Sequence, residues 1–218
     1  MRVEVLDNMP GIIIVTAQNA DAALINRLLL YVRDWEFSGD SIDDADSFAI
    51  LSTQQELLRV RGDSNEGITR PPIQEFPENE WEGLTIEEVE KIMLDNDSEK
   101  NGSTSLFLVL DDEGAEEGTI LVAHRASNDP EEDKFEYVND FNKVRVPWEC
   151  VYGMWCNLDI ANMGFDEFCN EDDILDSTKN GEPRRWWTYK NFMGEEHYVP
   201  FKAKAEEAIK ELGKLDLA

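Results

Sequence analysis

Four polar side chains between Trp155 and Phe168 are the best candidates for chemistry in this sequence. They are interspersed with large apolar residues, and they are Asn157, Asp159, Asn162 and Asp166. Such side chains either hydrogen-bond a ligand or cap a helix and close neighbouring turns. Because Asn and Asp commonly bond nearby backbone groups, the structural role is the favoured interpretation. Ligand binding, in a pocket near Trp148–Phe168, is the alternative.

A basic and aromatic patch lies closer to the C-terminus and consists of Arg184, Arg185, Trp186 and Trp187. Arginine and tryptophan dominate the hot spots of protein interfaces, which makes these residues candidates for partner binding. The same residue types also pack within a protein, because their long or flat side chains cover apolar surface. Docking against the acidic body formed by residues 1–170 avoids the entropic cost of association, so we favour internal docking.

The sequence contains no arrangement of nucleophile and base that is typical of a hydrolase. It has no GxSxG element, no P-loop and no GxGxxG fingerprint. Cys150 or Cys156 could pair with His197, but no local signature supports such a pair. We therefore predict no catalytic residue and no cofactor.

A metal site is not expected either. The three cysteines are separated by five and twelve intervening residues and form no CxxC pair. Asp95 begins a stretch similar to an EF-hand loop, but Lys100 stands where the sharp turn requires glycine. Leu106 then occupies the twelfth position, which requires glutamate.

The cysteines and the apolar runs bear on the compartment. Three cysteines form no disulfide scaffold, and apolar neighbours predict reduced, mostly buried thiols at Cys150, Cys156 and Cys169. The run from Gly11 to Ala17 is too short for a signal peptide and lacks a cationic lead-in. No run of about 18 apolar residues is present, so no membrane span is expected. We expect the cytoplasm, with the nucleus as the alternative.

Charge is the most unusual feature of the composition. The chain holds 48 acidic and 20 basic residues, a net charge of -28. Residues 1–170 hold 37 acids and 12 bases, a net of -25, and residues 171–218 hold 11 acids and 8 bases, a net of -3. Such a field repels nucleic acids and anionic lipids, and it attracts basic partners. The other interpretation of the charge is that it keeps the protein soluble.

These observations favour a non-enzymatic binding or interaction protein, with a basic protein as its partner. The alternative is a hydrolase-like enzyme that acts on a small molecule in a pocket near Trp148–Phe168. An enzyme requires a concave pocket with converging polar groups whose titration is perturbed.

The pattern of apolar residues predicts strands and helices in alternation. We expect helices at 21–35, 85–94 and 200–215, with a helix or helical turn at 159–168, and strands at 12–15, 48–51, 105–110, 119–124, 135–146 and 148–156. Thr85 and Glu88 form the sequence signature of a capping box. Residues 111–118 are expected to form a hairpin or a longer return between two strands. Within the segment 148–168 we expect one core formed by Trp148, Trp155, Ile160, Phe165 and Phe168.

The predicted elements indicate one domain of mixed α/β (α+β) class over residues 1–218. A central, mixed β-sheet carries several flanking helices in this interpretation. Residues 60–82 are rich in Gly, Pro and acids and are the best place for a subdivision. Residues 171–218 form a near-neutral C-terminal extension that contains the last helix.

Residues 81–168 also resemble a known family. The resemblance rests on Trp81–Glu88, on the strand pair at 105–110 and 119–124, and most specifically on Asn157–Phe168. The family consists of uncharacterised small proteins from actinomycetes and fungi and is known only as a domain of unknown function. The resemblance implies a mixed α/β domain and no particular reaction.

Overall fold

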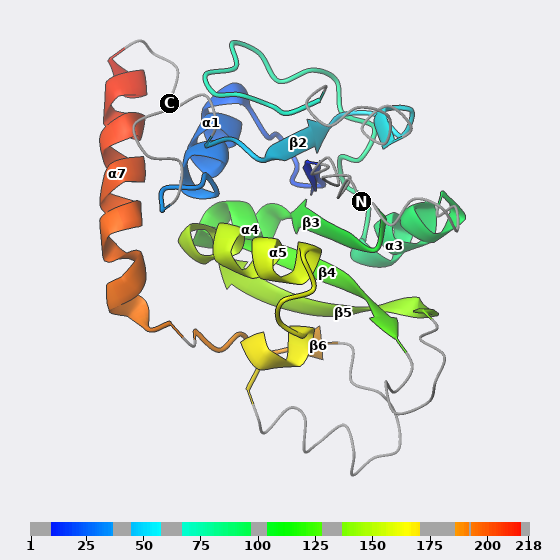
Figure 1. The fold of residues 1–218 in the computed structure, drawn as a ribbon. Helices are drawn as coiled ribbons and strands as arrows, with labels where there is room; N and C mark the ends of the chain where they lie inside the picture. Colours follow the sequence, from blue (N-terminus) through cyan, green and yellow to red (C-terminus); the bar gives the residue numbers. More distant parts are fainter. Residues whose placement is uncertain are drawn as a thin grey trace, which may run out of the picture.

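A mixed six-stranded sheet organises the chain in the computed structural model, which describes residues 10–36, 45–57, 67–96, 104–127, 137–170, 186–191 and 193–214. The strands are β1 (Gly11–Val15), β2 (Phe48–Leu51), β3 (Leu106–Leu110), β4 (Thr119–Ser127), β5 (Tyr137–Pro147) and β6 (Trp186–Trp187). Their order is β2-β1-β3-β4-β5-β6 (Figure 1). β1 pairs in parallel with β2 and β3, β4 is antiparallel to β3 and β5, and β6 is parallel to β5. The expected α/β fold with a central mixed sheet is confirmed.

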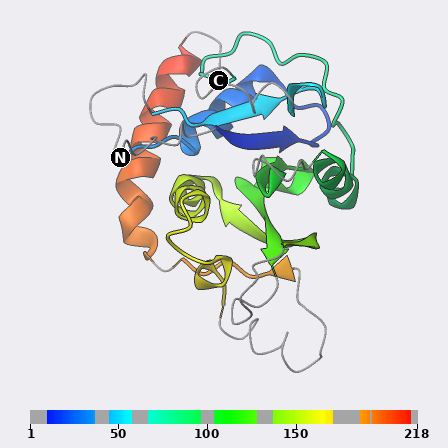
Figure 2. The same cartoon turned by 45° about the vertical axis from the view of Figure 1, so that its right-hand side comes forward.

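Helices cover both faces of the sheet. They are α1 (Ala22–Tyr31), α3 (Ile86–Asp95), α4 (Asp112–Glu117), α5 (Val151–Asp159) and α7 (Glu195–Gly213). Residues alternate between the two faces of a strand, so Ile13 and Val15 of β1 pack with α1 and α5, whereas Ile12 and Ile14 pack with α3. Figure 2 shows α5 and α7 on one side of the sheet and α3 on the other.

The starts of α1 and α3 follow from local sequence. The Asp21 side chain accepts a hydrogen bond from the Leu24 amide at 2.8 Å and caps α1. Thr85 and Glu88 form the predicted capping box, in which each side chain accepts from the other residue's backbone amide. Each cap satisfies amides that have no partner in the first helical turn.

The strand predicted at 148–156 is wrong. This segment forms a 3-10 turn, η3 (Trp148–Cys150), followed by α5. The side chains that α5 buries are Val151, Met154, Trp155 and Leu158, whose spacing is helical. Beyond α5, the predicted helical turn is limited to η4 (Phe165–Phe168).

The predicted core of this segment is confirmed for four residues and wrong for one. Trp148, Trp155, Phe165 and Phe168 belong to the same buried cluster. Ile160 is 60% exposed at the C-cap of α5.

The return between β3 and β4 is the short helix α4. Asp111 caps it by accepting from the Gly114 amide at 2.8 Å, and Gly118 ends it with a φ of 71°, a conformation that favours glycine. Gly114 is required by close contact, since a Cβ atom there would lie 2.5 Å from the carbonyl oxygen of Thr119.

Carboxylates cap the backbone at the edge where β1 and β2 end. They accept hydrogen bonds from free amides: Asp112 from Gln18, Glu82 from Asn19, Glu56 from Ser52 and Thr53, and Glu80 from Gln54. In open α/β sheets this edge commonly binds ligands, and amides of this kind bind phosphate groups. In this protein, acidic side chains already accept the hydrogen bonds of these amides.

The described parts of 60–82 and of the C-terminal extension both pack against the sheet domain. Ile73 exchanges two hydrogen bonds with the Asn26 side chain of α1, and Glu80 donates its amide to the Ser52 carbonyl oxygen. In the extension, β6 joins the edge of the sheet and α7 packs along α1. The last helix begins at Glu195, earlier than expected, and contains Pro200.

Candidate functional site

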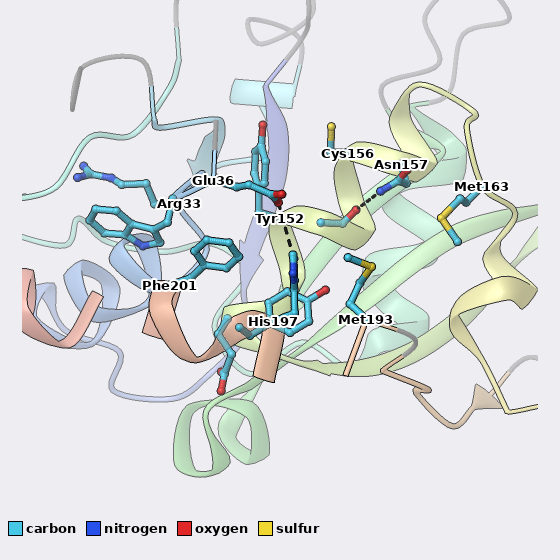
Figure 3. A pocket seen from close by; sticks show the side chains of 13 residues that line it. Arg33, Glu36, Tyr152, Cys156, Asn157, Met163, Met193, His197 and Phe201 are labelled. Carbon is cyan, nitrogen blue, oxygen red and sulfur yellow. Dashed lines mark hydrogen bonds and ion pairs between the residues drawn. The ribbon is translucent and has the colours of Figure 1, made fainter. Parts of the chain in front are cut away.

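A cavity of about 290 Å³ lies between the end of α1, the outer side of α5 and the first turns of α7 (Figure 3). α1 runs back from the carboxyl end of β1 to the start of β2, so its C-terminal end lies at the amino edge of these parallel strands. The cavity is therefore at the opposite end of the sheet from the carboxylate-capped edge.

Aromatic rings and thioethers form most of the cavity wall. The rings belong to Trp35 after α1, to Tyr152 on α5, and to His197, Tyr198 and Phe201 on α7. The last three are nearly perpendicular to one another, with centroids 4.9 to 6.3 Å apart. Such edge-to-face contacts stabilise the wall. Met163 and Met193 add flexible, polarisable surface.

The cation in the wall is already neutralised. The Arg33 guanidinium donates to both carboxylate oxygens of Asp46, at 2.9 and 3.1 Å, and each of these side chains is 5% exposed. The guanidinium also lies 5.4 Å from the centre of the Trp35 ring. A paired, buried arginine supports the wall and leaves no net positive charge for an anionic ligand.

The Glu36 and Glu149 carboxylates beside the cavity are more exposed than the Arg33 guanidinium. The Glu36 side chain is 43% exposed, and its oxygen lies 3.8 Å from Nε2 of His197 (Figure 3). Glu149 lies 3.2 Å from the Lys202 ammonium. Beneath them, the buried Asp34 carboxylate interacts with the Tyr152 hydroxyl. The local field is therefore negative.

The Tyr152 hydroxyl and the Cys156 thiol in the cavity wall are held neutral. Burial raises the pKa of Tyr152, and the neighbouring Asp34 carboxylate raises it further. Burial and the charge of Asp159 raise the pKa of the Cys156 thiol, although a hydrogen bond with Tyr152 acts in the opposite direction. A reactive cysteine requires a lowered pKa, so Cys156 lies in the environment of an inert thiol.

Asn157 is the one predicted ligand-binding residue among those that line the cavity in the described structure. Its Nδ2 donates to the Gly153 carbonyl oxygen at 2.8 Å, and its Oδ1 accepts from Nδ2 of Asn162 at 2.7 Å. These bonds close the C-terminal turn of α5. Asn162 itself is exposed outside the cavity.

The other two predicted ligand-binding residues lie on the surface. Asp159 is exposed in the last turn of α5, and Asp166 is exposed in η4. Neither lines the cavity. Their position gives them no direct contact with a ligand bound there.

Within the basic and aromatic patch, Arg184 and Arg185 lie outside the described residues. Trp187 donates its Nε1 hydrogen to Oδ1 of Asn142 at 3.3 Å and contacts the Phe165 ring. Trp186 is 47% exposed, and the Lys143 ammonium lies 5.4 Å from the centre of its ring. Both tryptophans thus contact the sheet domain from β6.

The three cysteines are free, as expected. Cys150 and Cys169 are buried, and Cys156 is half-buried. Burial raises the pKa of Cys150 to about 12, despite an opposing hydrogen bond from Tyr189. Among the residues described, no group of three or more His, Cys, Asp or Glu side chains could hold a metal ion.

Sequence reasoning missed most of the cavity. Trp35, Glu36 and Phe201 belong to no motif, and nothing local distinguishes them from core or surface residues. The one available signal was the pairing of Cys156 with His197, which the fold does bring to the same cavity.

Comparison with known proteins places the chain in a family. No curated protein and no solved structure matches it. In the part of the chain that the structure describes, no helix is long and apolar enough to cross a membrane. The model of a family described as a domain of unknown function, DUF6924, matches residues 45–179, which include the α5 wall of the cavity but not its α1 and α7 walls. Because the match covers more than half of the chain, the protein belongs to the DUF6924 family.

Proposed function

We propose that this protein is a non-enzymatic binding protein and that its cavity receives a cationic side chain from a basic protein partner. The observation that carries the proposal is the combination of aromatic and thioether walls with the exposed Glu36 carboxylate. Cations bind favourably over aromatic rings, most strongly where water is excluded.

The size of the cavity supports a single side chain as its occupant. At about 290 Å³ it lies just below the range of ligand pockets, roughly 300 to 1,000 Å³. The walls accept the apolar stem of a lysine or arginine, and the carboxylates near the opening attract its charged end. An anionic ligand has no unpaired cation to meet among the described residues that line the cavity.

The charge of the whole chain supports a basic partner. A net charge of -28 steers cationic proteins towards the surface and speeds association at low salt. The free thiols fit a reducing compartment such as the cytoplasm, where we place the protein.

Calorimetric titration tests the proposal with three blocked amino acids, N-acetyl-lysine methylamide, N-acetyl-arginine methylamide and N-acetyl-glutamate methylamide. At least one cationic compound should bind, more weakly at high salt, and the anionic compound should not. Glu36→Gln should weaken binding at least fivefold. Glu87→Gln is the matched control, because Glu87 carries the same charge on α3, across the sheet. Tighter binding of the glutamate compound would overturn the proposal.

A second candidate is a small-molecule enzyme, favoured by the presence of Cys156, His197 and Glu36 in one cavity. The raised pKa of Cys156 argues against a thiolate nucleophile. The rate of alkylation of Cys156 by iodoacetamide, compared with a Cys156→Ser variant, tests this. A fast reaction already at pH 6 would favour the enzyme, and a rate that rises only above pH 9 would exclude a cysteine nucleophile.

A further inference from the structure

We infer that the cavity prefers an alkylated ammonium, such as the side chain of trimethyl-lysine, over an unmodified lysine or arginine. This inference rests on the proposed function and names the chemical class of the cation. It follows from the hydrogen bonds that the cavity wall has already formed.

Apart from the exposed Glu36 carboxylate, several acceptors in the wall already accept hydrogen bonds from within the protein. The Gly153 carbonyl oxygen accepts from Asn157, and Oδ1 of Asn157 accepts from Asn162. Glu149 is bonded to Lys202 at 3.2 Å. A lysine ammonium brings three donors and a guanidinium brings five, and each must replace its lost water with an acceptor. A trimethylated ammonium brings none.

The cavity walls instead offer aromatic and thioether surface, against which a methylated cation packs. Tyr152, Tyr198 and Phe201 present aromatic rings from two different helices, so the cation meets ring surface from α5 and from α7. Quaternary ammonium groups are recognised by aromatic cages of this kind. Met163 and Met193 supply flexible thioethers that pack against methyl groups.

The surrounding charges attract a cation whether or not the cation carries hydrogen-bond donors. Four carboxylates, Asp34, Glu36, Asp46 and Glu149, line the cavity or bond to residues that line it, against the three cations Arg33, Lys202 and Lys204. The attraction of a charge acts over several ångströms and needs no hydrogen bond. The negative field of these carboxylates therefore attracts a methylated ammonium as strongly as an unmodified one.

Calorimetry with the wild-type protein separates this inference from the proposed function. N-acetyl-trimethyl-lysine methylamide should bind at least tenfold more tightly than N-acetyl-lysine methylamide, and more tightly than the neutral analogue with carbon in place of the charged nitrogen. Equal affinity for the methylated and unmethylated compounds would overturn the inference and leave the proposed function standing. Absence of binding by every cation would overturn both. Tighter binding of choline than of the trimethyl-lysine compound would assign the cavity to a free small amine and overturn the lysine side chain as its occupant.

Substitutions in the cavity wall test which residues produce the preference for the methylated cation. Phe201→Leu should reduce the affinity for the trimethyl compound at least tenfold and the affinity for unmodified lysine by a smaller factor. Val199→Leu is the matched control, because Val199 lies two positions away on α7 and is 61% exposed. Circular dichroism checks that both variants fold. If Phe201→Leu does not fold, Tyr152→Leu makes the same test from α5, and an unchanged preference in it would overturn the inference.

Discussion

Arg145 on β5 donates to both carboxylate oxygens of Asp111, at 2.9 and 2.7 Å, while Asp111 also caps α4. One carboxylate thus joins the end of β3, the start of α4 and the strand β5, which lies on the far side of β4. Burial by itself raises the pKa of Asp111, but the hydrogen bonds from Arg145 and the Gly114 amide outweigh it and hold the pKa below its ordinary value.

Replacing Asp111 should reveal its two roles, as the cap of α4 and as the partner of Arg145. Asp111→Ala should lower the free energy of unfolding by about 2 kcal/mol, and Asp111→Asn, which keeps the cap, by about 1 kcal/mol. Because the folded pKa is lowered, the ionic part of this stability is present above pH 4 and is lost as the pH falls through the folded value. Urea unfolding between pH 3 and pH 7 measures it. Glu116→Gln, an exposed change on α4, should have little effect.

The Lys143 ammonium on β5 and the Glu90 carboxylate on α3 form a buried ion pair. We predict the effect of removing one or both of these side chains. Burial raises the pKa of Glu90, against the opposing effect of its hydrogen bond with Lys143. Glu90→Leu leaves the Lys143 ammonium buried, so it should cost about 3 to 5 kcal/mol. The double variant Glu90→Leu, Lys143→Leu should cost less than Glu90→Leu alone. A double-mutant cycle by urea unfolding checks this, and equal losses would contradict it.

The C-terminus of α5 contains a strained residue. Ala161 has a φ of 51°, in the left-handed region, while its amide donates to the Leu158 carbonyl oxygen and the Asn162 amide donates to that of Asn157. Glycine usually occupies this position of a helix end. Ala161→Gly should therefore stabilise the protein by about 0.5 to 1 kcal/mol, after the greater freedom of glycine in the unfolded chain is subtracted. Thermal unfolding measures the change, and a lower midpoint would refute the strain.

His124 should make stability depend on pH near neutrality. Its ring stacks on Phe165 at 6.0 Å, and burial lowers its pKa below 6.5. The unfolded chain therefore binds a proton before the folded protein does, and stability falls as the pH drops below 6.5. The loss is about 1.4 kcal/mol for each unit by which the pKa is lowered. His124→Phe keeps a ring that can stack on Phe165, so the difference in stability between variant and wild type should stop changing with pH above pH 7.5 if titration is the cause.

The parts of the fold that could be predicted carry local signals. The Thr85–Glu88 pair specifies the start of α3 by itself, and the β-branched run in β1 is typical of a buried strand. The run at 148–156 carries an ambiguous signal, because a buried helix and a buried strand both appear as continuous apolar sequence. Tyr152 adds to the ambiguity, since it is aromatic on the outer side of α5, where the cavity lies.

The candidate site could be predicted only at Asn157 and in the pairing of Cys156 with His197. Trp35, Tyr152 and Phe201 come from three distant segments, and packing of α7 along α1 brings them together. Such packing depends on tertiary contacts, which leave no pattern in the sequence around each residue. Asp159 and Asp166 are polar residues of the same segment as Asn157, but both are exposed and neither lines the cavity.

The carboxylates that cap the ends of β1 and β2 divide the acidic residues into two populations. Surface acids such as Glu87 and Glu116 repel one another, so converting them to amides relieves repulsion. Asp112, Glu56 and Glu80 hold loop amides in place, and the same conversion there weakens those bonds. An effort to make this protein less acidic can therefore draw on the first population freely, whereas changes in the second would loosen the ends of two strands.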